Sequence, residues 1–274
     1  MPSIDQLSIN LATVREQWDL PAAVAGCVRA GIPAIAPWRD QVAKVGLAEA
    51  ARVIGDAGLR VSGLCRGGMF PATDAAGRRA RIDDNRRAIE EAATLGAQCL
   101  VLVVGGLCPG SKDIGGARLM VEDGLAAILE DARAAGVPLA IEPLHPMYAA
   151  DRSCVNTLGH ALDLCDRLGT GTGVALDVYH VWWDPELEDQ IRRCGKDRLL
   201  AFHICDWLVP TTDLLLDRGM MGDGVIDIPK IRGWVEAQGY EGLHEVEIFS
   251  AQNWWKRDPD EVLFTCVERH RTCC

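Results

Sequence analysis

The chain alternates between amphipathic stretches and short apolar runs. The amphipathic stretches repeat apolar residues every three to four positions with charged residues between them, most clearly in residues 81–96 and 117–136, and this spacing predicts helices. Most of the apolar runs follow a glycine, which suits the left-handed position that ends a helix. A continuous apolar run is typical of a parallel strand that is buried on both faces. Eight such runs are predicted strands: residues 6–14, 29–37, 56–64, 94–104, 134–143, 171–180, 198–207 and 238–249.

The alternation of strands and helices predicts the fold. Eight strands alternating with helices, without a glycine-rich dinucleotide-binding fingerprint, favour a (β/α)8 TIM barrel over a doubly wound sheet. The length of 274 residues fits such a barrel, which typically has about 250. No linker or shift in composition divides the chain, so we expect a single α/β domain over residues 1–274. The remaining helices are expected around residues 44–57, 157–168, 185–194, 228–238 and 259–270.

Four polar side chains stand at the carboxyl ends of consecutive predicted strands: Glu142, Asp177, His203 and Glu247. In a TIM barrel, the chemistry gathers at this end of the strands, so the four side chains should meet at the barrel mouth. An unpaired buried carboxylate is costly, and a divalent cation would offset the burial of these three. Two Glu, one Asp and one His suit Mn²⁺, which we favour, and also Mg²⁺, Co²⁺ or Zn²⁺. Glu245 faces the same side of its strand as Glu247, and we choose Glu247 because it lies nearer the strand end.

Other residues near the predicted mouth are candidates for contact with a substrate. Trp38 is one of several tryptophans that follow strand ends, and aromatic faces form flat walls for the C–H faces of a carbohydrate. We therefore expect a small carbohydrate-like or polyol substrate. Arg152, soon after the fifth strand, is the preferred contact to an anionic or oxygen-rich group. The other basic candidates at loop positions are Arg39, Arg66 and Lys112.

Two further residues are assigned roles around the ligand set. His145 stands on the loop after Glu142, where a general base or a polarising group would be useful. Asp206 lies three residues beyond His203, and histidine ligands usually donate their second ring N–H to a carboxylate or carbonyl. We expect His145 to take part in catalysis and Asp206 to support the ring of His203.

Composition narrows the partners and the location. Asp and Glu number 39 against 28 Lys and Arg, a net charge of −11, which disfavours binding to a nucleic-acid backbone. No apolar stretch approaches the roughly 20 residues that span a bilayer. The 11 cysteines are scattered and form no CxxC pair, and the N-terminal MPSIDQLSIN lacks the basic and apolar regions of a signal peptide. We expect free thiols, a cytoplasmic location and no membrane partner, and the sequence leaves open whether the chain forms a homo-oligomer.

The order and spacing of five motifs resemble the xylose-isomerase-like TIM barrels, which include sugar-phosphate isomerases and epimerases, ketose 3-epimerases, hydroxypyruvate isomerases and inosose dehydratases. The motifs are IEPLHP, DVYH, FHICD, GDGVID and EVEIF, and the resemblance covers essentially the whole chain. It implies that Glu142, Asp177, His203 and Glu247 are the metal ligands and that His180 helps to hold a substrate oxygen. In the ketose epimerases of this family, the two metal-bound glutamates also exchange protons with the substrate.

Two positions depart from the ketose 3-epimerase pattern. Those enzymes carry a second glutamate six residues after the first, where this chain has Tyr148. They also carry an arginine six residues after the metal-binding histidine, where this chain has Val209. Ketohexose 3-epimerisation is therefore disfavoured as the specific activity.

Two reactions fit these residues. In an isomerase or epimerase, the metal would chelate a carbonyl and a neighbouring hydroxyl of a sugar, keto-sugar or polyol-derived substrate. Glu142 or Glu247 would remove the α-proton, and the other glutamate or His145 would return a proton to the enediolate. In a lyase, the same intermediate would instead expel a leaving group, as in inosose-dehydratase-like loss of water or cleavage of a C-linked glycoside, with His145 as acid and base.

Two other classes are weighed against these reactions. A DNA-repair endonuclease on the same barrel would need more metal ligands and a basic groove, which six histidines and a net charge of −11 disfavour. A non-catalytic binding module would require the four-residue ligand set to be accidental or empty.

Overall fold

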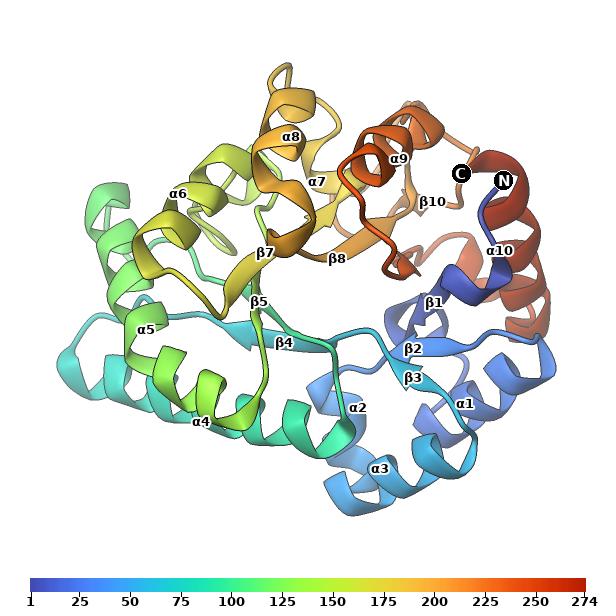
Figure 1. The fold of residues 1–274 in the computed structure, drawn as a ribbon, viewed down its shortest axis with the longest axis horizontal. Coiled ribbons are helices and arrows are strands. Elements are labelled where there is room, and N and C mark those ends of the chain that lie inside the picture. The colour runs from blue at the N-terminus through green and yellow to red at the C-terminus, as the bar shows by residue number, and fades with distance from the viewer.

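Strands that are distant in the sequence pair side by side in one parallel sheet that closes on itself (Figure 1). The computed structural model describes residues 1–274. β1 (Leu7–Asn10) pairs with β2 (Ala34–Ala36) on one side and with β11 (His244–Val246) on the other. Beyond β11 follow β8 (Leu199–Ile204), β7 (Thr172–Asp177), β6 (Leu139–Ile141), β5 (Leu100–Val103) and β4 (Leu64–Gly68).

The barrel closes at its third strand, which consists of two short segments. β3 (Arg60–Val61) pairs with β2, and after a break at residues 62–63 the next segment, β4, pairs with β5. The nine segments of the sheet therefore occupy eight positions around the barrel. The predicted (β/α)8 TIM barrel is confirmed, with shorter strands than the apolar runs from which they were predicted.

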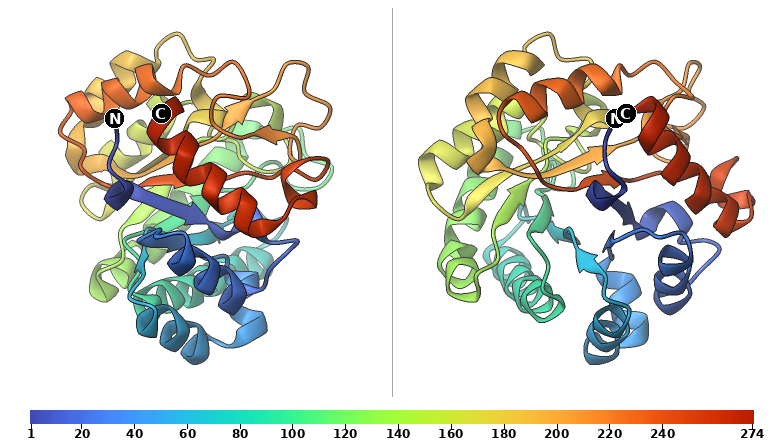
Figure 2. Two further views of the ribbon diagram at one scale, coloured as in Figure 1. Left: turned by 90° about the vertical axis from the view of Figure 1, so that its right-hand side faces the viewer. Right: turned by 45° about the vertical axis from the view of Figure 1, so that its right-hand side comes forward.

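Helices form the outer layer around the barrel, and the two chain ends lie next to each other (Figures 1 and 2). Gly96 and Gly136 end the two longest helices in the left-handed region, at φ of 64° and 68°, as the sequence predicted. The helix predicted over residues 44–57 is instead two helices, because Gly46 adopts φ of 92° between them. The helices are α1 (Leu20–Arg29), α2 (Arg39–Val45), α3 (Leu47–Asp56), α4 (Ala75–Leu95), α5 (Ile114–Ala135), α6 (Leu158–Leu168), α7 (Val178–Val181), α8 (Leu187–Arg198), α9 (Ile228–Ala237) and α10 (Pro259–Cys273).

A small hairpin and four short 3₁₀ segments complete the structure. β9 (Asp206–Trp207) pairs antiparallel with β10 (Arg218–Gly219), and residues 208–217 connect them. The 3₁₀ segments are η1 (Ile4–Gln6), η2 (Leu11–Val14), η3 (Pro146–Tyr148) and η4 (Trp254–Lys256). None of the helices has the length and apolar character that crossing a bilayer requires.

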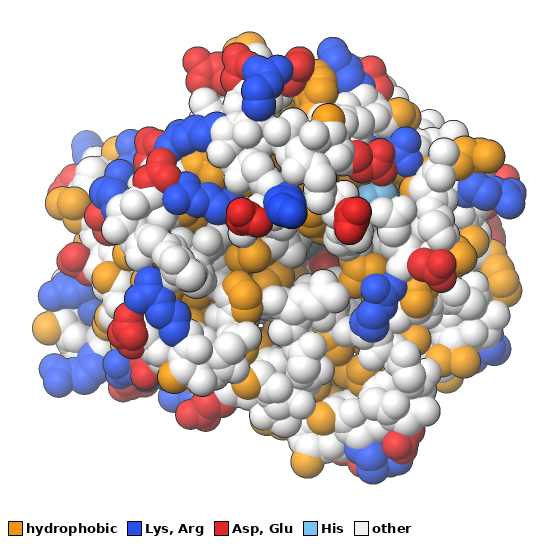
Figure 3. Space-filling view, in the orientation of Figure 1, with side chains coloured by type: hydrophobic (Ala, Val, Ile, Leu, Met, Phe, Trp, Pro, Cys, Tyr) orange, Lys and Arg blue, Asp and Glu red, His pale blue; other side chains and the backbone are white.

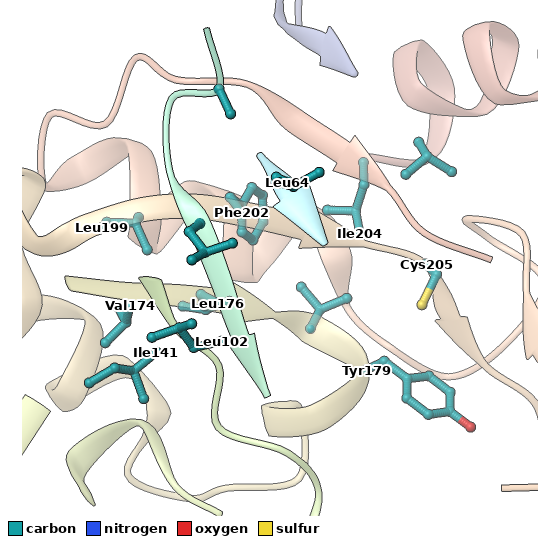
Figure 4. Packing of buried hydrophobic residues seen from close by; sticks show 14 of the residues in the cluster. Leu64, Leu102, Ile141, Val174, Leu176, Tyr179, Leu199, Phe202, Ile204 and Cys205 are labelled. Atoms are coloured by element: carbon teal, nitrogen blue, oxygen red, sulfur yellow. The ribbon is translucent and has the colours of Figure 1, made fainter. Parts of the chain in front are cut away.

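The core is divided by the alternation of side chains along the strands. Large residues such as Ile141, Leu176 and Phe202 belong to one extensive buried cluster of the barrel and its helices (Figure 4). Residues at the alternate positions of the strands form a second, small cluster: Cys65, Cys99, Val101, Ala140, Ala175 and Ala201. Because side chains alternate along a strand, the residue two positions after each inward alanine also points into the barrel. Those residues are Glu142, Asp177 and His203.

Candidate metal centre

The four predicted ligands meet at the carboxyl ends of neighbouring strands. Glu142 directly follows β6, Asp177 ends β7, His203 lies in β8 and Glu247 directly follows β11. One potential ligand atom from each lies within 4.8 Å of the others, and all four residues are buried. Two features therefore place these side chains at the barrel mouth. Each stands at the carboxyl end of its strand, and each continues the series of inward-pointing residues of that strand.

The ring of His203 separates two sets of carboxylates. Its Nδ1 atom lies 3.2 Å from Glu142 Oε1 and 3.9 Å from Glu247 Oε2. On the opposite edge, its Nε2 atom lies 3.4 Å from Glu245 Oε1. Glu245 also accepts hydrogen bonds from Ser62 Oγ at 2.6 Å and Asn10 Nδ2 at 2.8 Å. Glu247 thus belongs to the cluster, while Glu245 is placed to hold the other side of the histidine.

Buried polar atoms without partners indicate that a cation fits this cluster. Glu142 Oε1 and both ring nitrogens of His203 form no hydrogen bond, although buried polar groups nearly always have one. Carboxylate oxygens and an imidazole nitrogen are the donors that first-row divalent cations and Mg²⁺ accept in proteins. The chemistry of the donor set and its unpartnered atoms are therefore both consistent with a divalent metal ion.

Charge within the cluster shifts its proton affinities. Burial raises the pKa of Glu247 to about 8, and the Glu142 charge adds to the rise, although Arg218 opposes it. For His203, burial alone would lower the pKa, but the charges of Glu245, Glu142 and Glu247 together raise it well above its ordinary value. A cation bound here would therefore compete with protons for the same groups.

Arg218, which sequence reasoning did not identify, is buried in the same cluster. Its Nη1 atom donates to Asp177 Oδ2 at 2.9 Å and to Glu247 Oε2 at 3.0 Å. Its guanidinium carbon lies 4.4 Å from the ring centroid of Tyr179 and 5.2 Å from that of Phe249. Against burial, which would raise it, the Arg218 charge lowers the pKa of Asp177. Arg218 neutralises part of the acidic cluster and presents its remaining N–H groups beside it.

The signal for Arg218 is weak in the sequence because it comes from the β9–β10 hairpin rather than from a barrel strand. The position expected to carry an arginine, Val209, lies on the same hairpin and is 71% exposed. Arg218 lies four residues before the start of the GDGVID segment at Gly222, and its place near a recognised motif was the only available clue.

His180, the predicted contact to a substrate oxygen, lies beside Arg218 and Asp177. Its Nε2 atom is 3.3 Å from Arg218 Nη2 and 3.7 Å from Asp177 Oδ2. Burial lowers the pKa of His180 to about 3, so the ring is neutral near pH 7. A neutral imidazole can accept or donate one hydrogen bond without adding charge to the site.

A narrow cavity leads to the cluster. Its lining includes Glu142 and Glu247 together with four of the candidate substrate contacts, which are Trp38, Arg66, Arg152 and His180. The cavity is partly open to the surface, and its volume of about 40 Å³ has room for about one or two water molecules. A sugar-sized ligand therefore requires some of the covering residues to move.

The β9–β10 loop supplies part of that cover. Leu215 lines the cavity, and the carbonyl of the neighbouring Leu214 accepts hydrogen bonds from the hydroxyls of Tyr148 and Tyr179. Tyr148 occupies the position where ketose 3-epimerases carry their second glutamate. In this chain, the side chain at that position holds the covering loop.

Several predicted residues lie outside the cavity. Lys112 is exposed and does not line it. His145 is half-buried, stacks on Trp207 with ring centroids 5.1 Å apart, and accepts a hydrogen bond from the Met147 N–H. Arg39 is bound in ion pairs to Asp84 and Glu91 on the flank of the barrel. Of the tryptophans that follow strand ends, Trp38 alone is among the lining residues.

The expectation that Asp206 supports His203 is wrong. Its carboxylate instead accepts hydrogen bonds from the backbone N–H groups of Gly222, Gly224 and Ile226, at 3.0, 2.8 and 2.9 Å. These bonds hold the GDGVID segment against β9. The physical reason is strand geometry, because Asp206 follows the end of β8 and leaves the barrel, whereas Glu245 lies opposite His203 in the register of β8 and β11.

The residues that hold Trp38 and Glu247 form a chain of hydrogen bonds. Trp38 Nε1 donates to Asn10 Oδ1 at 2.7 Å, which fixes the orientation of the Asn10 amide. The Asn10 Nδ2 group then donates to Glu245 and, at 3.1 Å, to Glu247 Oε1. Asn10 ends β1 and was not identified from the sequence, where a single buried amide carries no recognisable pattern.

Comparison with known proteins places this geometry in a family. The sequence pattern of the family described as "xylose isomerase-like TIM barrel" matches residues 24–264. A crystal structure of a protein from Sinorhizobium meliloti 1021 is 67% identical, has a TM-score of 0.98 and covers 99% of each chain. Comparison with curated proteins gave no match.

More distant solved structures share the fold. The IolI protein with a bound zinc atom is 20% identical with a TM-score of 0.84, over 98% of this chain and 97% of the other. D-allulose 3-epimerase from Methylomonas sp., in complex with D-allulose, is 20% identical with a TM-score of 0.79, over 100% of this chain and 98% of the other. At these identities, the likeness establishes a common fold.

Proposed function

The chain belongs to the xylose isomerase-like TIM barrel family, and on that premise we propose that it is a divalent-metal-dependent isomerase or epimerase of a small sugar-like substrate. The observation that carries the proposal is the buried cluster of Glu142, Asp177, His203 and Glu247, with ligand atoms within 4.8 Å of one another. Relatives of the same fold named as sugar epimerases support this class of reaction.

The four clustered residues would hold the cation, for which we favour Mn²⁺. When bound, the cation supplies positive charge that lowers the energy of the oxyanion formed as a proton leaves the carbon next to a carbonyl. The donor set is rich in carboxylates, and such hard oxygen ligands suit Mn²⁺ and Mg²⁺. The proposal requires only one cation, because the cluster offers one set of converging donors.

Glu142 and Glu247 are the proposed proton carriers. Both line the cavity, and they come from opposite sides of the cluster, after β6 and after β11. A carboxylate is one of the side-chain groups that commonly act as general acid and base. A carboxylate on each side of a substrate carbon permits removal of a proton from one face and delivery to the other.

Arg218 and His180 are the proposed holders of substrate oxygen. Arg218 has N–H groups beside Asp177 and Glu247, and the neutral ring of His180 lies 3.3 Å from Arg218 Nη2. The Tyr148 and Tyr179 hydroxyls keep the β9–β10 loop over the site, which limits the entry of water. Exclusion of water strengthens each charge interaction within the cavity.

The decisive experiment measures proton exchange by metal-reconstituted protein. Keto-sugars, aldoses and inososes are incubated in deuterated solvent with the Mn²⁺-loaded enzyme, and products are read by mass spectrometry and NMR. We expect deuterium at the carbon next to the carbonyl, together with an isomer of unchanged skeleton. The Glu142→Gln and Glu247→Gln variants should lose exchange by a factor of 100 or more, on the order of the contribution of general acid–base catalysis. Conversion without solvent exchange would contradict the proposal.

A lyase reaction is the second candidate, favoured by Tyr148 at the position of the ketose 3-epimerase glutamate. The hydroxyl of Tyr148 is bound to the Leu214 carbonyl, so this position does not offer the carboxylate that those epimerases place near the substrate carbonyl. If the substrate carries a leaving group next to the carbanion, the same proton removal leads to its loss. Product mass separates the two reactions, because isomerisation conserves mass and elimination of water reduces it.

A further inference from the structure

Arg66 and Arg152 are half-buried arginines that line the cavity, and neither has a carboxylate partner. They contribute to the same lining as Glu142 and Glu247, the two proposed proton carriers. Burial and the nearby Arg152 charge hold the pKa of Arg66 below its ordinary value. The two guanidinium groups therefore bring two positive charges into one small space without a direct ion pair to either, in a chain whose net charge is −11.

Arginines on the adjoining surface, in contrast, form ion pairs with carboxylates of the chain. Arg15 pairs with Asp40 at 2.6 Å. Arg39 pairs with Asp84 at 3.0 Å and with Glu91 at 2.5 Å. Partial burial of an unpaired charge costs free energy that these pairings reduce. Arg66 and Arg152 have no similar partner, so their N–H donors are available to a group from outside the chain.

The backbone of β4 directs Arg66 to the cavity. The pairing of β4 with β5 shifts register between Cys65 and Gly67, so Arg66 is the extra residue of a β-bulge. Bulges change the direction of a side chain and often occur beside active sites. Asn85 of α4 fixes this bend, because its side chain accepts from the Gly68 N–H at 2.6 Å and donates to the Gly68 carbonyl at 2.8 Å.

Arg152 is held from the other side of the mouth. Its carbonyl accepts from the Gly105 N–H at 2.9 Å, and its N–H donates to the Tyr148 carbonyl at 3.0 Å. Its guanidinium carbon lies 5.5 Å from the ring centroid of Tyr148. Stacking on a ring orients a guanidinium while leaving the N–H donors at its edge free for another group.

We propose that Arg66 and Arg152 bind an anionic group of the substrate, a carboxylate or a phosphate, while the other end of the same molecule reaches the metal centre. This inference rests on the proposed function and narrows its substrate from neutral sugars to sugar acids or sugar phosphates. Both anions match the planar, multidentate donors of arginine. An anion would also relieve the repulsion between the two guanidinium groups, which a neutral sugar could not do.

Binding of simple anions provides the direct test. Inorganic phosphate and malonate are titrated separately into Mn²⁺-loaded protein by calorimetry, with wild type and the Arg66→Gln and Arg152→Gln variants. We expect saturable binding of at least one anion, weakened about 10- to 100-fold in each variant, as expected for loss of a charge-assisted hydrogen bond. The preferred anion distinguishes a phosphate from a carboxylate. Equal binding by wild type and both variants, or no binding by wild type, would overturn the inference.

Two controls separate local recognition from a change in net charge or fold. Arg271→Gln removes the same charge from an exposed position near the end of α10 and should leave anion binding unchanged. Arg152→Lys keeps the charge but not the planar donors and should give intermediate affinity. Thermal unfolding of every variant checks that each protein remains folded.

Metal binding separates this inference from the proposed function. If Mn²⁺ binds but anion affinity does not depend on Arg66 or Arg152, the inference fails and the proposed function stands. If Mn²⁺ does not bind, the proposed function fails, and anion titration of the metal-free protein still tests the two arginines. Once a substrate is found, both Gln variants should raise KM with little change in kcat, because they remove binding that is equal in the ground and transition states.

Discussion

Glu245 illustrates how one residue can govern the centre without belonging to it. Its carboxylate lies 3.4 Å from His203 Nε2, while His203 Nδ1 faces Glu142 and Glu247. A carboxylate on the far edge of a histidine fixes its tautomer and makes the other nitrogen more basic. The Ser62 and Asn10 side chains hold Glu245 in that position.

We expect Glu245→Gln to weaken metal binding about 10- to 100-fold, because the ring of His203 loses its charged partner while all four proposed ligands remain. Competition with a chelator of known affinity measures the change. Glu241→Gln, at an exposed position shortly before β11, is the matched control and should have no effect. Unchanged affinity in the Glu245 variant would show that the carboxylate does not act on the metal centre.

Metal affinity should also depend on pH. In the metal-free protein, the pKa of Glu247 is raised to about 8 by burial, and that of His203 is raised well above its ordinary value. Both groups must lose a proton before they bind a cation. Affinity for Mn²⁺ should therefore increase as the pH rises from 6 to 8, by up to about tenfold per pH unit for each displaced proton. Chelator competition across that range measures it, and a constant affinity would contradict the raised pKa values.

At the scale of elements, the β9–β10 hairpin and the GDGVID segment act as a cover that Asp206 anchors. Three backbone N–H groups of that segment donate to the Asp206 carboxylate. Asp206→Asn should lower the free energy of unfolding by about 2 kcal/mol, because an amide replaces the charged acceptor and turns a donor toward other donors. Urea denaturation measures the loss.

The same variant should leave metal affinity nearly unchanged, since Asp206 does not contact His203. Asp223→Asn is the matched control within the segment, where only a long ion pair of 3.4 Å with Arg269 is removed, and little stability should be lost. A fall in metal affinity as large as that expected for Glu245→Gln would show that Asp206 does support the ring of His203.

The strand elements were predictable and the hairpin was not, for a physical reason. Glu142, Asp177, His203 and Glu247 continue an inward alternation that starts in apolar strands, so sequence order fixes both their face and their end of the barrel. Arg218 reaches the cluster from a hairpin whose course depends on tertiary contacts such as those of Tyr148 and Tyr179. Residues on the loops after the strands have no such fixed direction. Arg152 lines the cavity, whereas Lys112 is exposed.

At the scale of the whole molecule, charge is dispersed on the surface and concentrated inside. On the face in Figure 3, acidic and basic side chains are interspersed without an extended basic patch. The interior holds the acidic cluster, Arg218 and several neutral histidines. Such buried titratable groups, rather than surface ion pairs, should dominate the response of stability to pH.

Five of the six histidines favour the neutral form because they are buried or half-buried: His145, His160, His180, His244 and His270. Burial lowers the pKa of His180 and His244 to about 3 and that of His270 to about 4. His244 Nδ1 lies 3.0 Å from His270 Nε2, and the His270 charge lowers the pKa of His244 further. The Arg232 charge lowers both pKa values.

These depressed values make the fold sensitive to acid. Below an ordinary pKa of about 6.5, the unfolded chain takes up protons that the folded chain does not accept until near pH 3 to 4. The stabilisation from neutral histidines is complete above pH 6.5 and is lost as the pH falls toward 4. Glu247 and His203 act in the opposite sense, because their raised pKa values keep protons on the folded state, but below about pH 6 these two groups do not offset the three buried histidines.

The free energy of unfolding of the metal-free protein should therefore fall between pH 6 and pH 4, by about 1.4 kcal/mol per pH unit for each net proton taken up on unfolding. His270→Gln keeps a hydrogen-bonding group beside His244 and removes one titrating ring, so its stability should depend less steeply on pH. Urea titrations at three pH values measure both slopes. Parallel slopes for the variant and wild type would show that the His244–His270 pair is not the source of the acid sensitivity, and would direct attention to His180, the one neutral histidine in the proposed active site.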